Sequence, residues 1–258
     1  MKKNTVQLQN ITLGAGMPKI CVPVMGKKLR ELEAAVLAAR EQADLIELRL
    51  DSVSPEIDAD ELCAVCRALR EKAQGTALLA TMRTVRDGGA GDADAARYEA
   101  LLTALAKAHV CDALDAELSV GEDAFARIVK AAHAAGVPVV GSFHDFEKTP
   151  SIEAMENKLR RMAALGADVC KIAVMPKTEE DVRALQTACA RANDALPQPI
   201  IAISMGALGV STRTQAEVFG SCLSFGTVGA ASAPGQMEAR ALRQALEALH
   251  KKLTNREP

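Results

Sequence analysis

The feature that most constrains the fold is a regular alternation of short apolar runs with longer, alanine-rich amphipathic runs. The short runs have the length and composition of β-strands and span residues 19–24, 45–51, 77–83, 111–118, 138–146, 169–175, 199–206 and 223–228. The amphipathic runs between them predict helices at residues 29–42, 59–72, 93–108, 122–135, 151–165 and 179–193. The repeat of roughly 30 residues is the size of a βαβ unit. Eight strands in a chain of 258 residues therefore predict a (β/α)8 TIM barrel.

The alternative arrangement of these elements is an open, doubly wound sheet. Such a sheet usually carries a G-x-G-x-x-G turn after its first strand, and the sequence contains none. Before the first βα unit, residues 5–9 and 11–14 predict a short β-hairpin that turns at Asn10. No linker or low-complexity segment interrupts the chain, so we expect a single domain over residues 1–258. The predicted class is α/β, a TIM barrel with an N-terminal β-hairpin.

Composition limits the partners and the location of the protein. Hydrophobic residues make up 49% of the chain, and 31 basic and 33 acidic residues leave a net charge of −2 without a polybasic stripe. We therefore expect no nucleic-acid partner. No apolar run approaches the ~18 residues of a membrane span, and Met1-Lys-Lys-Asn-Thr5 lacks an apolar stretch behind it, so neither a membrane partner nor a secretory signal is expected. Seven scattered cysteines indicate reduced thiols and a cytoplasmic protein, and the pair Cys63 and Cys66 lacks the second pair of a zinc site.

Polar residues interrupt five consecutive strands, and within each strand they occupy alternate positions. Because successive side chains of a strand point to opposite faces, the polar face should point into the barrel and the apolar face toward the helices. The polar face carries Glu47, Arg49, Asp51, Thr81, Arg83, Asp115, Glu117, Ser142, His144 and Lys171. A buried structural ion network, with Glu47 paired to Arg49 and Asp115 to an arginine, is the alternative explanation. Convergence of charge from five strands near their carboxyl ends favours a functional site instead.

Lys171 and His144 are the candidates for the chemistry. Lys171 lies in the middle of an otherwise apolar strand, where it is either paired with Asp115 or Glu117 or acts as an amine nucleophile of lowered pKa. His144 lies near the end of the preceding strand and is either a proton-transfer partner for that amine or a hydrogen-bonded core histidine. Together the two residues suggest Schiff-base chemistry. The other histidines fall in helical stretches and are expected at the surface: His109, His133 and His250.

Two loops after the last strands supply further candidates. Arg213 follows the seventh strand in a glycine-containing loop, where its guanidinium is suited to a carboxylate unless it is simply solvated. Residues 229–236 follow the eighth strand and are small and flexible, with Ser232 and Gln236 as hydrogen-bonding groups. This segment is predicted to be a lid over the barrel mouth, the alternative being an ordinary βα loop.

With these residues in this order, the chain resembles the type I 3-dehydroquinate dehydratases, which are Schiff-base enzymes with a TIM-barrel fold. The resemblance runs from about residue 18 to about residue 243. Its specificity comes from the order of the matching segments: Glu47-Leu-Arg49 with Asp51, Thr81-Met-Arg83, Gly141-Ser-Phe-His-Asp-Phe146, Cys170-Lys-Ile-Ala173, Met205-Gly206 through Arg213, Glu217-Val-Phe-Gly220, and Ser232-Ala-Pro-Gly-Gln236.

The resemblance implies a lyase of the shikimate pathway, which leads to chorismate and the aromatic amino acids. In that family Lys171 would form an iminium with the ketone of 3-dehydroquinate, and His144 would act as general acid and base in a syn elimination. Arg213 would bind the substrate carboxylate, with Ser232 and Gln236 closing over it. No cofactor and no metal are implied, because the lysine supplies the electron sink. A homodimer is also expected.

Three further binding residues are implied by the same resemblance. Glu47 and Arg83 would bind ring hydroxyls, and Arg49 would support Glu47 and keep the lumen cationic.

Two positions depart from the family pattern. Many members carry glutamate in an Arg-x-x-x-Glu-Gly-Gly loop where this chain has Asp87. The resemblance implies that Asp87, despite its shorter side chain, supports the catalytic histidine. Some members have serine where this chain has Pro23. The rival functions are a Schiff-base aldolase with a phosphate-binding site, which is common after strands seven and eight of such barrels, and a barrel that serves as a scaffold without catalysis.

Overall fold

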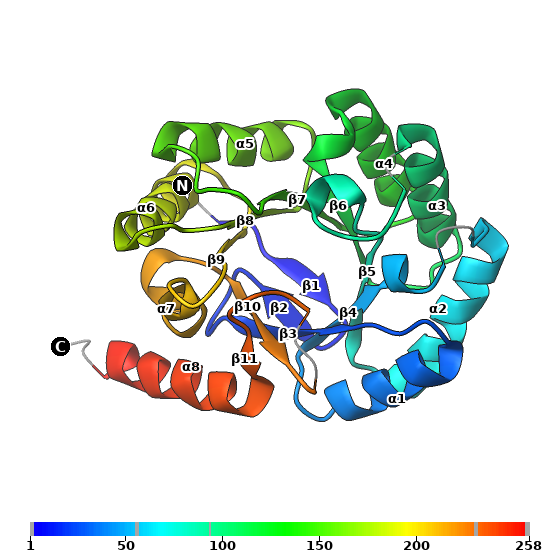
Figure 1. Ribbon diagram of the computed structural model, residues 1–258, viewed down its shortest axis with the longest axis horizontal. Coiled ribbons are helices and arrows are strands. Elements are labelled where there is room, and N and C mark those ends of the chain that lie inside the picture. The colour runs from blue at the N-terminus through cyan, green and yellow to red at the C-terminus, as the bar shows by residue number, and fades with distance from the viewer. Residues whose placement is uncertain (1–2, 55–56, 93, 230–231, 256–258) are drawn as a thin grey trace.

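A parallel sheet curled into a barrel forms the centre of the molecule, and helices surround it (Figure 1). The computed structural model describes residues 3–54, 57–92, 94–229 and 232–255. Within these residues the sheet has nine strands in the order β11-β10-β3-β4-β5-β6-β7-β8-β9. The predicted α/β TIM-barrel class is therefore confirmed. The strands are β3 (Lys19–Val24), β4 (Leu45–Arg49), β5 (Ala77–Thr81), β6 (Ala113–Glu117), β7 (Val139–Asp145), β8 (Val169–Val174), β9 (Ile200–Ser204), β10 (Leu223–Thr227) and β11 (Met237–Glu238).

The helices alternate with the strands along the chain, as the periodicity predicts. They are α1 (Leu29–Ala39), α2 (Ala59–Ala73), α3 (Ala95–Lys107), α4 (Glu122–Ala134), α5 (Ile152–Ala164), α6 (Glu179–Ala195), α7 (Val210–Thr214) and α8 (Ala239–Thr254). Short 3₁₀ turns follow several strands, namely η1 (Leu50–Ser52), η2 (Val85–Asp87) and η3 (Leu118–Val120), with η4 (Ala216–Phe219) after α7. No helix in the described ranges combines the length and apolar character needed to cross a bilayer.

The two faces of the strands separate as predicted from the alternation of their residues. Ile46 and Leu48 of β4 belong to the large core between sheet and helices, whereas Leu45 belongs to a second core inside the barrel. The same division holds in β8, where Ile172 packs outward and Val169 packs inward. Polar residues of the inward parity therefore point into the lumen above the inner apolar layer.

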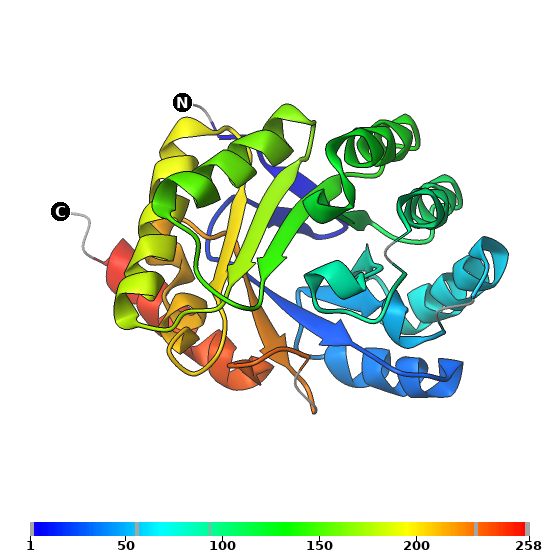
Figure 2. The same cartoon turned by 45° about the horizontal axis from the view of Figure 1, so that its top comes forward.

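The predicted N-terminal hairpin closes one end of the barrel. Strands β1 (Val6–Leu8) and β2 (Ile11–Leu13) pair antiparallel. Leu8, Ile11 and Leu13 are buried in the same core as the inward residues at the start of the barrel strands. The hairpin thus plugs the end at which the strands begin (Figure 2), and the other end is left for a site.

Three aspartates fasten neighbouring strands at that closed end. Each immediately precedes a strand and bonds twice to one residue of the strand before it. The carboxylate oxygen Oδ2 accepts that residue's backbone N–H, at 2.7 Å for Asp44, 2.8 Å for Asp112 and 2.7 Å for Asp168. The aspartate's own N–H donates to the same residue's carbonyl, at distances of 2.9, 2.8 and 2.9 Å. Each carboxylate also meets a cationic or imidazole side chain from a helix, which is Arg243, Arg70 and His133 respectively.

The corresponding position before β10 is Cys222, which has no carboxylate. Its N–H still donates to the Ile200 carbonyl at 2.8 Å. The neighbouring Ser221 hydroxyl accepts the Ala202 N–H at 3.1 Å. Here the barrel closes through an isolated bridge between Ile200 and Ser221, and β11 adds to the free edge of β10. The seam of the barrel therefore lies where the aspartate is missing.

Several element boundaries differ from the predictions. β3 ends as predicted, whereas the other seven predicted strands end one or two residues earlier; β4 and β6 do so because the chain turns into η1 after Arg49 and into η3 after Glu117. The loop expected to hold Arg213 contains the short helix α7. Elements as short as α7 and β11 carry too few residues for a periodic pattern to reveal them.

Candidate active site

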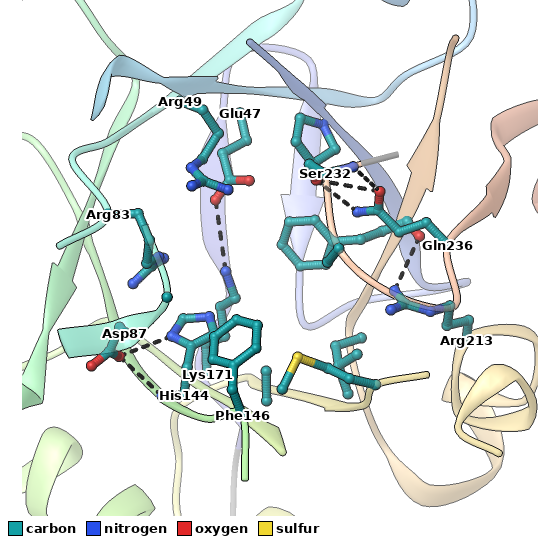
Figure 3. A pocket seen from close by; sticks show the side chains of 17 residues that line it. Glu47, Arg49, Arg83, Asp87, His144, Phe146, Lys171, Arg213, Ser232 and Gln236 are labelled. Carbon is teal, nitrogen blue, oxygen red and sulfur yellow. Dashed lines mark hydrogen bonds and ion pairs between the residues drawn. The ribbon is translucent and has the colours of Figure 1, made fainter. Parts of the chain in front are cut away.

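A cavity of about 590 Å³, its mouth included, opens where the barrel strands end. It brings together side chains from strands far apart in sequence (Figure 3). All nine candidate residues line it: Glu47, Arg49, Arg83, Asp87, His144, Lys171, Arg213, Ser232 and Gln236. The predicted convergence of polar residues in one place is thus present in the structure.

Lys171 is buried on β8, with 4% of its surface exposed. Its Nζ atom lies 3.7 Å from Oε1 of Glu47 and 3.6 Å from Oδ2 of Asp115. The same atom lies 4.5 Å from the centre of the Phe225 ring, a cation–π contact. Of the two pairings expected for the lysine, the one with Asp115 is present, and Glu117 bonds elsewhere. Glu47 is an additional partner that the sequence analysis did not predict.

His144 is held by Asp87 in a single orientation. Oδ2 of Asp87 lies 3.0 Å from Nδ1 of the ring and also accepts the backbone N–H of His144 at 3.0 Å. The shorter aspartate side chain therefore reaches the histidine. An Nδ1–H that donates to Asp87 leaves Nε2 as the basic nitrogen of the ring. Phe146 stacks on the imidazole with the ring centres 6.2 Å apart.

Burial and nearby cations set the charge of the imidazole. Burial lowers the pKa of His144 well below its ordinary value, and the positive charges of Arg83 and Lys171 lower it further. The ring is therefore neutral near neutral pH and able to accept a proton. Burial raises the pKa of Asp87, although hydrogen bonds from Ser119 and the His144 backbone oppose the rise.

Gly88 lets the Asp87 turn pack closely against the histidine strand. Its φ is +78°, and a Cβ atom at this position would lie 2.4 Å from the Phe146 ring. A side chain here would displace either the ring or the turn. The glycine therefore fixes the position of Asp87 relative to His144.

Arg83, in the loop after β5, joins β6 to β7 at the base of the cavity. Its Nη1 donates to Glu117 at 2.8 Å and to Ser142 at 3.0 Å, and its Nη2 donates to Asp115 at 2.9 Å. Burial alone would raise the pKa of Asp115, but the charges of Arg83 and Lys171 lower it overall. The expected pairing of Asp115 with an arginine is thus correct. Both terminal nitrogens of Arg83 already have protein partners.

Tyr98 of α3 completes the layer below Arg83. Its hydroxyl accepts the backbone N–H of Glu117 at 3.0 Å and donates to the Asp115 carbonyl at 3.4 Å. The ring is 1% exposed, and burial, reinforced by the two carboxylates, raises the pKa of the phenol well above its usual value.

Arg49 does not pair with Glu47, which corrects one expectation. It forms a two-pronged ion pair with Asp51, Nε to Oδ1 at 2.9 Å and Nη2 to Oδ2 at 2.8 Å. The Asp51 carboxylate also accepts the backbone N–H groups of Arg83 and Ala90 at 3.3 and 3.2 Å. Asp51 lies in η1, the turn that follows β4, and from there its carboxylate reaches both Arg49 and the loop after β5.

Arg213 is a buried cation without a carboxylate partner among the described residues. It is 1% exposed, and burial lowers the pKa of its guanidinium to about 10. Nη1 donates to the Phe225 carbonyl at 3.3 Å and Nη2 to the Pro234 carbonyl at 3.1 Å. Nε has no described partner. A buried charge of this kind is suited to an anionic ligand.

The segment predicted to be a lid lines the cavity through Ser232, Ala233 and Gln236, while residues 230 and 231 lie outside the described part of the chain. Ser232 donates its backbone N–H to Oε1 of Gln236 at 2.8 Å, and Nε2 of Gln236 donates to the Ser232 hydroxyl at 3.0 Å. The Pro234 carbonyl accepts the Gly206 N–H at 3.1 Å. Gly235 allows this approach, because a Cβ atom there would lie 2.2 Å from the Gly206 oxygen.

Three residues that contact the proposed catalytic pair were not proposed as site residues from the sequence. Asp115 was recognised on the inward face but not as a partner of the reactive amine. Phe225 shares the inward parity of β10, and this pattern would have revealed it. Phe146 stands two residues beyond His144 with no distinguishing pattern. No cluster of three or more His, Cys, Asp or Glu side chains suited to a metal occurs in the described part of the chain.

The fold and the cavity define a barrel enzyme that acts on a small molecule. The model of the type I 3-dehydroquinase family matches residues 20–253. The chain therefore belongs to the type I 3-dehydroquinases. This membership favours the dehydratase over the two rivals, an aldolase and a scaffold without catalysis.

Similar proteins cover nearly the whole chain. A 3-dehydroquinate dehydratase of Bacillus licheniformis is 41% identical over 253 residues, which are 97% of this chain and 100% of that protein. One of Lactiplantibacillus plantarum is 43% identical over 247 residues, 95% of this chain and 97% of that protein. The crystal structure of the type I enzyme of Clostridium difficile with covalently modified comenic acid has a TM-score of 0.93 at 38% identity, covering 97% of this chain and 99% of that one.

Proposed function

We propose that the chain dehydrates 3-dehydroquinate to 3-dehydroshikimate through a Schiff base on Lys171. The observation that carries the proposal is a buried primary amine and a buried neutral imidazole lining the same cavity. The similar Clostridium difficile enzyme, crystallised with covalently modified comenic acid, also supports covalent chemistry. The reaction places the enzyme in the shikimate pathway.

The first half of the reaction builds the electron sink. The Lys171 amine attacks the ketone carbon, and loss of water gives an iminium. The positive nitrogen withdraws electrons from the adjacent carbon and acidifies its proton. This sink belongs to the protein, so the proposed reaction requires no cofactor.

His144 then carries out the elimination. Its neutral Nε2 removes the proton beside the iminium and returns a proton to the departing hydroxyl on the same face, a syn elimination. Asp87 keeps the ring oriented throughout through Nδ1. Hydrolysis of the product iminium frees Lys171 for the next cycle.

The remaining cavity residues position the substrate. Arg213, a buried guanidinium without a carboxylate among its described contacts, binds the substrate carboxylate. Ser232 and Gln236 close over it and exclude water. Glu47 lines the same cavity and faces the ring hydroxyls.

Two arginines are assigned narrower roles by their contacts. Arg83 bonds to Asp115 and Glu117 at the base of the cavity and retains an N–H of Nη2 for a ring hydroxyl. Arg49 contributes positive charge and, through Asp51, anchors the loop that carries Asp87. The cytoplasmic location, the homodimer, the absence of nucleic-acid and membrane partners and the single-domain organisation stay predictions.

Borohydride trapping tests the covalent step. Incubation with 3-dehydroquinate and sodium borohydride is expected to inactivate the enzyme and to leave a reduced adduct on Lys171, located by peptide mass spectrometry. Lys171→Met should form no adduct, whereas the same change at exposed Lys130 should leave the adduct unaffected. An unmodified Lys171 in an enzyme that still turns over after this treatment would disprove the mechanism.

A further inference from the structure

Lys171 is surrounded at rest by groups that favour an ammonium ion. The carboxylates of Glu47 and Asp115 lie within 3.7 and 3.6 Å of Nζ, and the face of Phe225 lies at 4.5 Å. An ammonium ion has no lone pair and does not attack a ketone. One proton must therefore leave Nζ before the covalent step, and the site must contain a group that receives it.

Asp115 is poorly suited to receive this proton. Its Oδ2 accepts a bond from the Arg83 guanidinium at 2.9 Å, and its Oδ1 accepts the Ser142 hydroxyl at 2.6 Å. Protonation of Asp115 would leave the buried Arg83 short of a counter-charge. Asp115 is thus committed to holding the layer beneath the cavity.

Glu47 is the less committed carboxylate. Among the described contacts its side chain accepts one hydrogen bond, from the Thr81 hydroxyl to Oε1 at 3.0 Å, and forms one ion pair, with Lys171 itself. It also lines the cavity, so a proton taken up here remains accessible to the reacting atoms. Neutral Glu47 would leave no other cation unpaired.

His144 is placed one layer higher. Ser142 is the β7 residue paired with Lys171 in the sheet, and His144 lies two residues further along that strand. Two residues of a strand span about 6.6 Å, which suits a base that works on the substrate ring rather than on Nζ. No hydrogen bond between His144 and Lys171 occurs among the described contacts, whereas the imidazole is bound to Asp87.

We propose that Glu47 is the catalytic base that takes the proton from Lys171 and so makes the amine nucleophilic. The inference rests on the Schiff-base function proposed above. The Lys171 ammonium carries three protons, and the iminium nitrogen keeps one. The other two leave with the ketone oxygen as water, the first by way of Glu47 and the second transferred from the attacking nitrogen to oxygen. The step needs no other reactant.

The experiment isolates imine formation by using the product, 3-dehydroshikimate, which forms the same adduct without a dehydration step. Enzyme and a saturating concentration of product are mixed, quenched with borohydride at increasing times, and analysed by intact-protein mass spectrometry at several pH values. In Glu47→Gln the adduct should form at least ~100-fold more slowly at neutral pH, the scale of general-base catalysis. The rate should then rise about tenfold per pH unit, because solvent hydroxide must remove the proton. Glu47→Asp, which keeps the charge, should be intermediate.

The controls separate the possible outcomes. Glu153→Gln, the same change at an exposed position on α5, should behave as wild type, and thermal melting checks that each variant is folded. If Glu47→Gln forms the adduct at the wild-type rate and only binds product more weakly, the proposal is wrong and Glu47 is a hydroxyl-binding residue. If Asp115→Asn shows the slow, pH-dependent rate in its place, the proposal is equally wrong. Absence of any adduct in the wild type would instead overturn the Schiff-base function itself.

Discussion

Both ends of the barrel join carboxylates to cationic or imidazole groups, but the two sets are built differently. At the closed end Asp44, Asp112 and Asp168 each bond to the main chain of a neighbouring strand and to a partly exposed helix residue. At the open end Glu47 and Asp115 bond to side chains and are almost fully buried.

The carboxylates at the closed end stabilise the fold, whereas those at the open end act on the reactive amine. A carboxylate bonded to backbone N–H groups fixes two strands, and its cation can exchange with water at little cost. A buried carboxylate whose partner is the reactive amine changes the properties of that amine, and it has no water to replace the partner. Paired variants at the two ends test this distinction.

The largest expected effect compares two histidines that each bond to an aspartate. His144→Ala should lower kcat by ~10²–10⁴-fold, because it removes the proposed acid and base. His133→Ala, which removes a 43% exposed ring from Asp168, should leave kcat unchanged and cost less than about 1 kcal/mol of unfolding free energy. Steady-state kinetics and urea unfolding measure both. Normal turnover by His144→Ala would show that the base lies elsewhere.

The next effect compares two arginines in their ion pairs. Arg83→Met should lower the free energy of unfolding by about 3–5 kcal/mol, because two buried carboxylates lose their cation. Arg70→Met should cost about 1 kcal/mol or less, since this pair with Asp112 is partly exposed. Equal losses in urea titrations of the two variants would contradict the comparison.

The smallest effect concerns the titration of His144. Burial, together with the charges of Arg83 and Lys171, lowers its pKa, so Lys171→Met should move the imidazole titration to higher pH, as followed by the NMR shift of its ring proton. The unfolded chain binds a proton at about pH 6.5, before the folded one does. Stability should therefore fall as pH drops below that value, and fall less in Lys171→Met. An unchanged titration curve would remove Lys171 from the causes.

The sequence predicts most of the fold because burial imposes regular patterns. In segments 45–51 and 169–175, alternate positions were predicted to face the helices and the lumen, and the structure has them so. The aspartates before β4, β6 and β8 were not predicted to fasten the strands, since a single residue at the start of a strand produces no periodic signal. The seam at Ser221 and Cys222 depends on tertiary closure, which local patterns do not encode.

The sequence predicted which residues line the site better than it predicted which of them form ion pairs with one another. All nine candidates line one cavity, but Arg49 bonds to Asp51 rather than Glu47, and Arg83 is occupied by Asp115 and Glu117. Parity states which face a side chain occupies, whereas its partner depends on strand stagger and side-chain length. The contacts of Lys171 with Glu47 and Phe225 depend on stagger and side-chain length in this way, so the sequence did not predict them.

The position of Tyr98 determines what the intrinsic fluorescence of the protein reports. It is the single tyrosine of a chain without tryptophan, and its hydroxyl contacts the backbone of Asp115 and Glu117 directly beneath the reactive layer. The near-ultraviolet emission of the whole protein therefore arises almost entirely from one ring at one place. Tyrosine fluorescence should therefore report on the surroundings of Asp115 and Glu117. The weak near-ultraviolet absorbance of the protein should also make the absorbance of a conjugated product easy to follow.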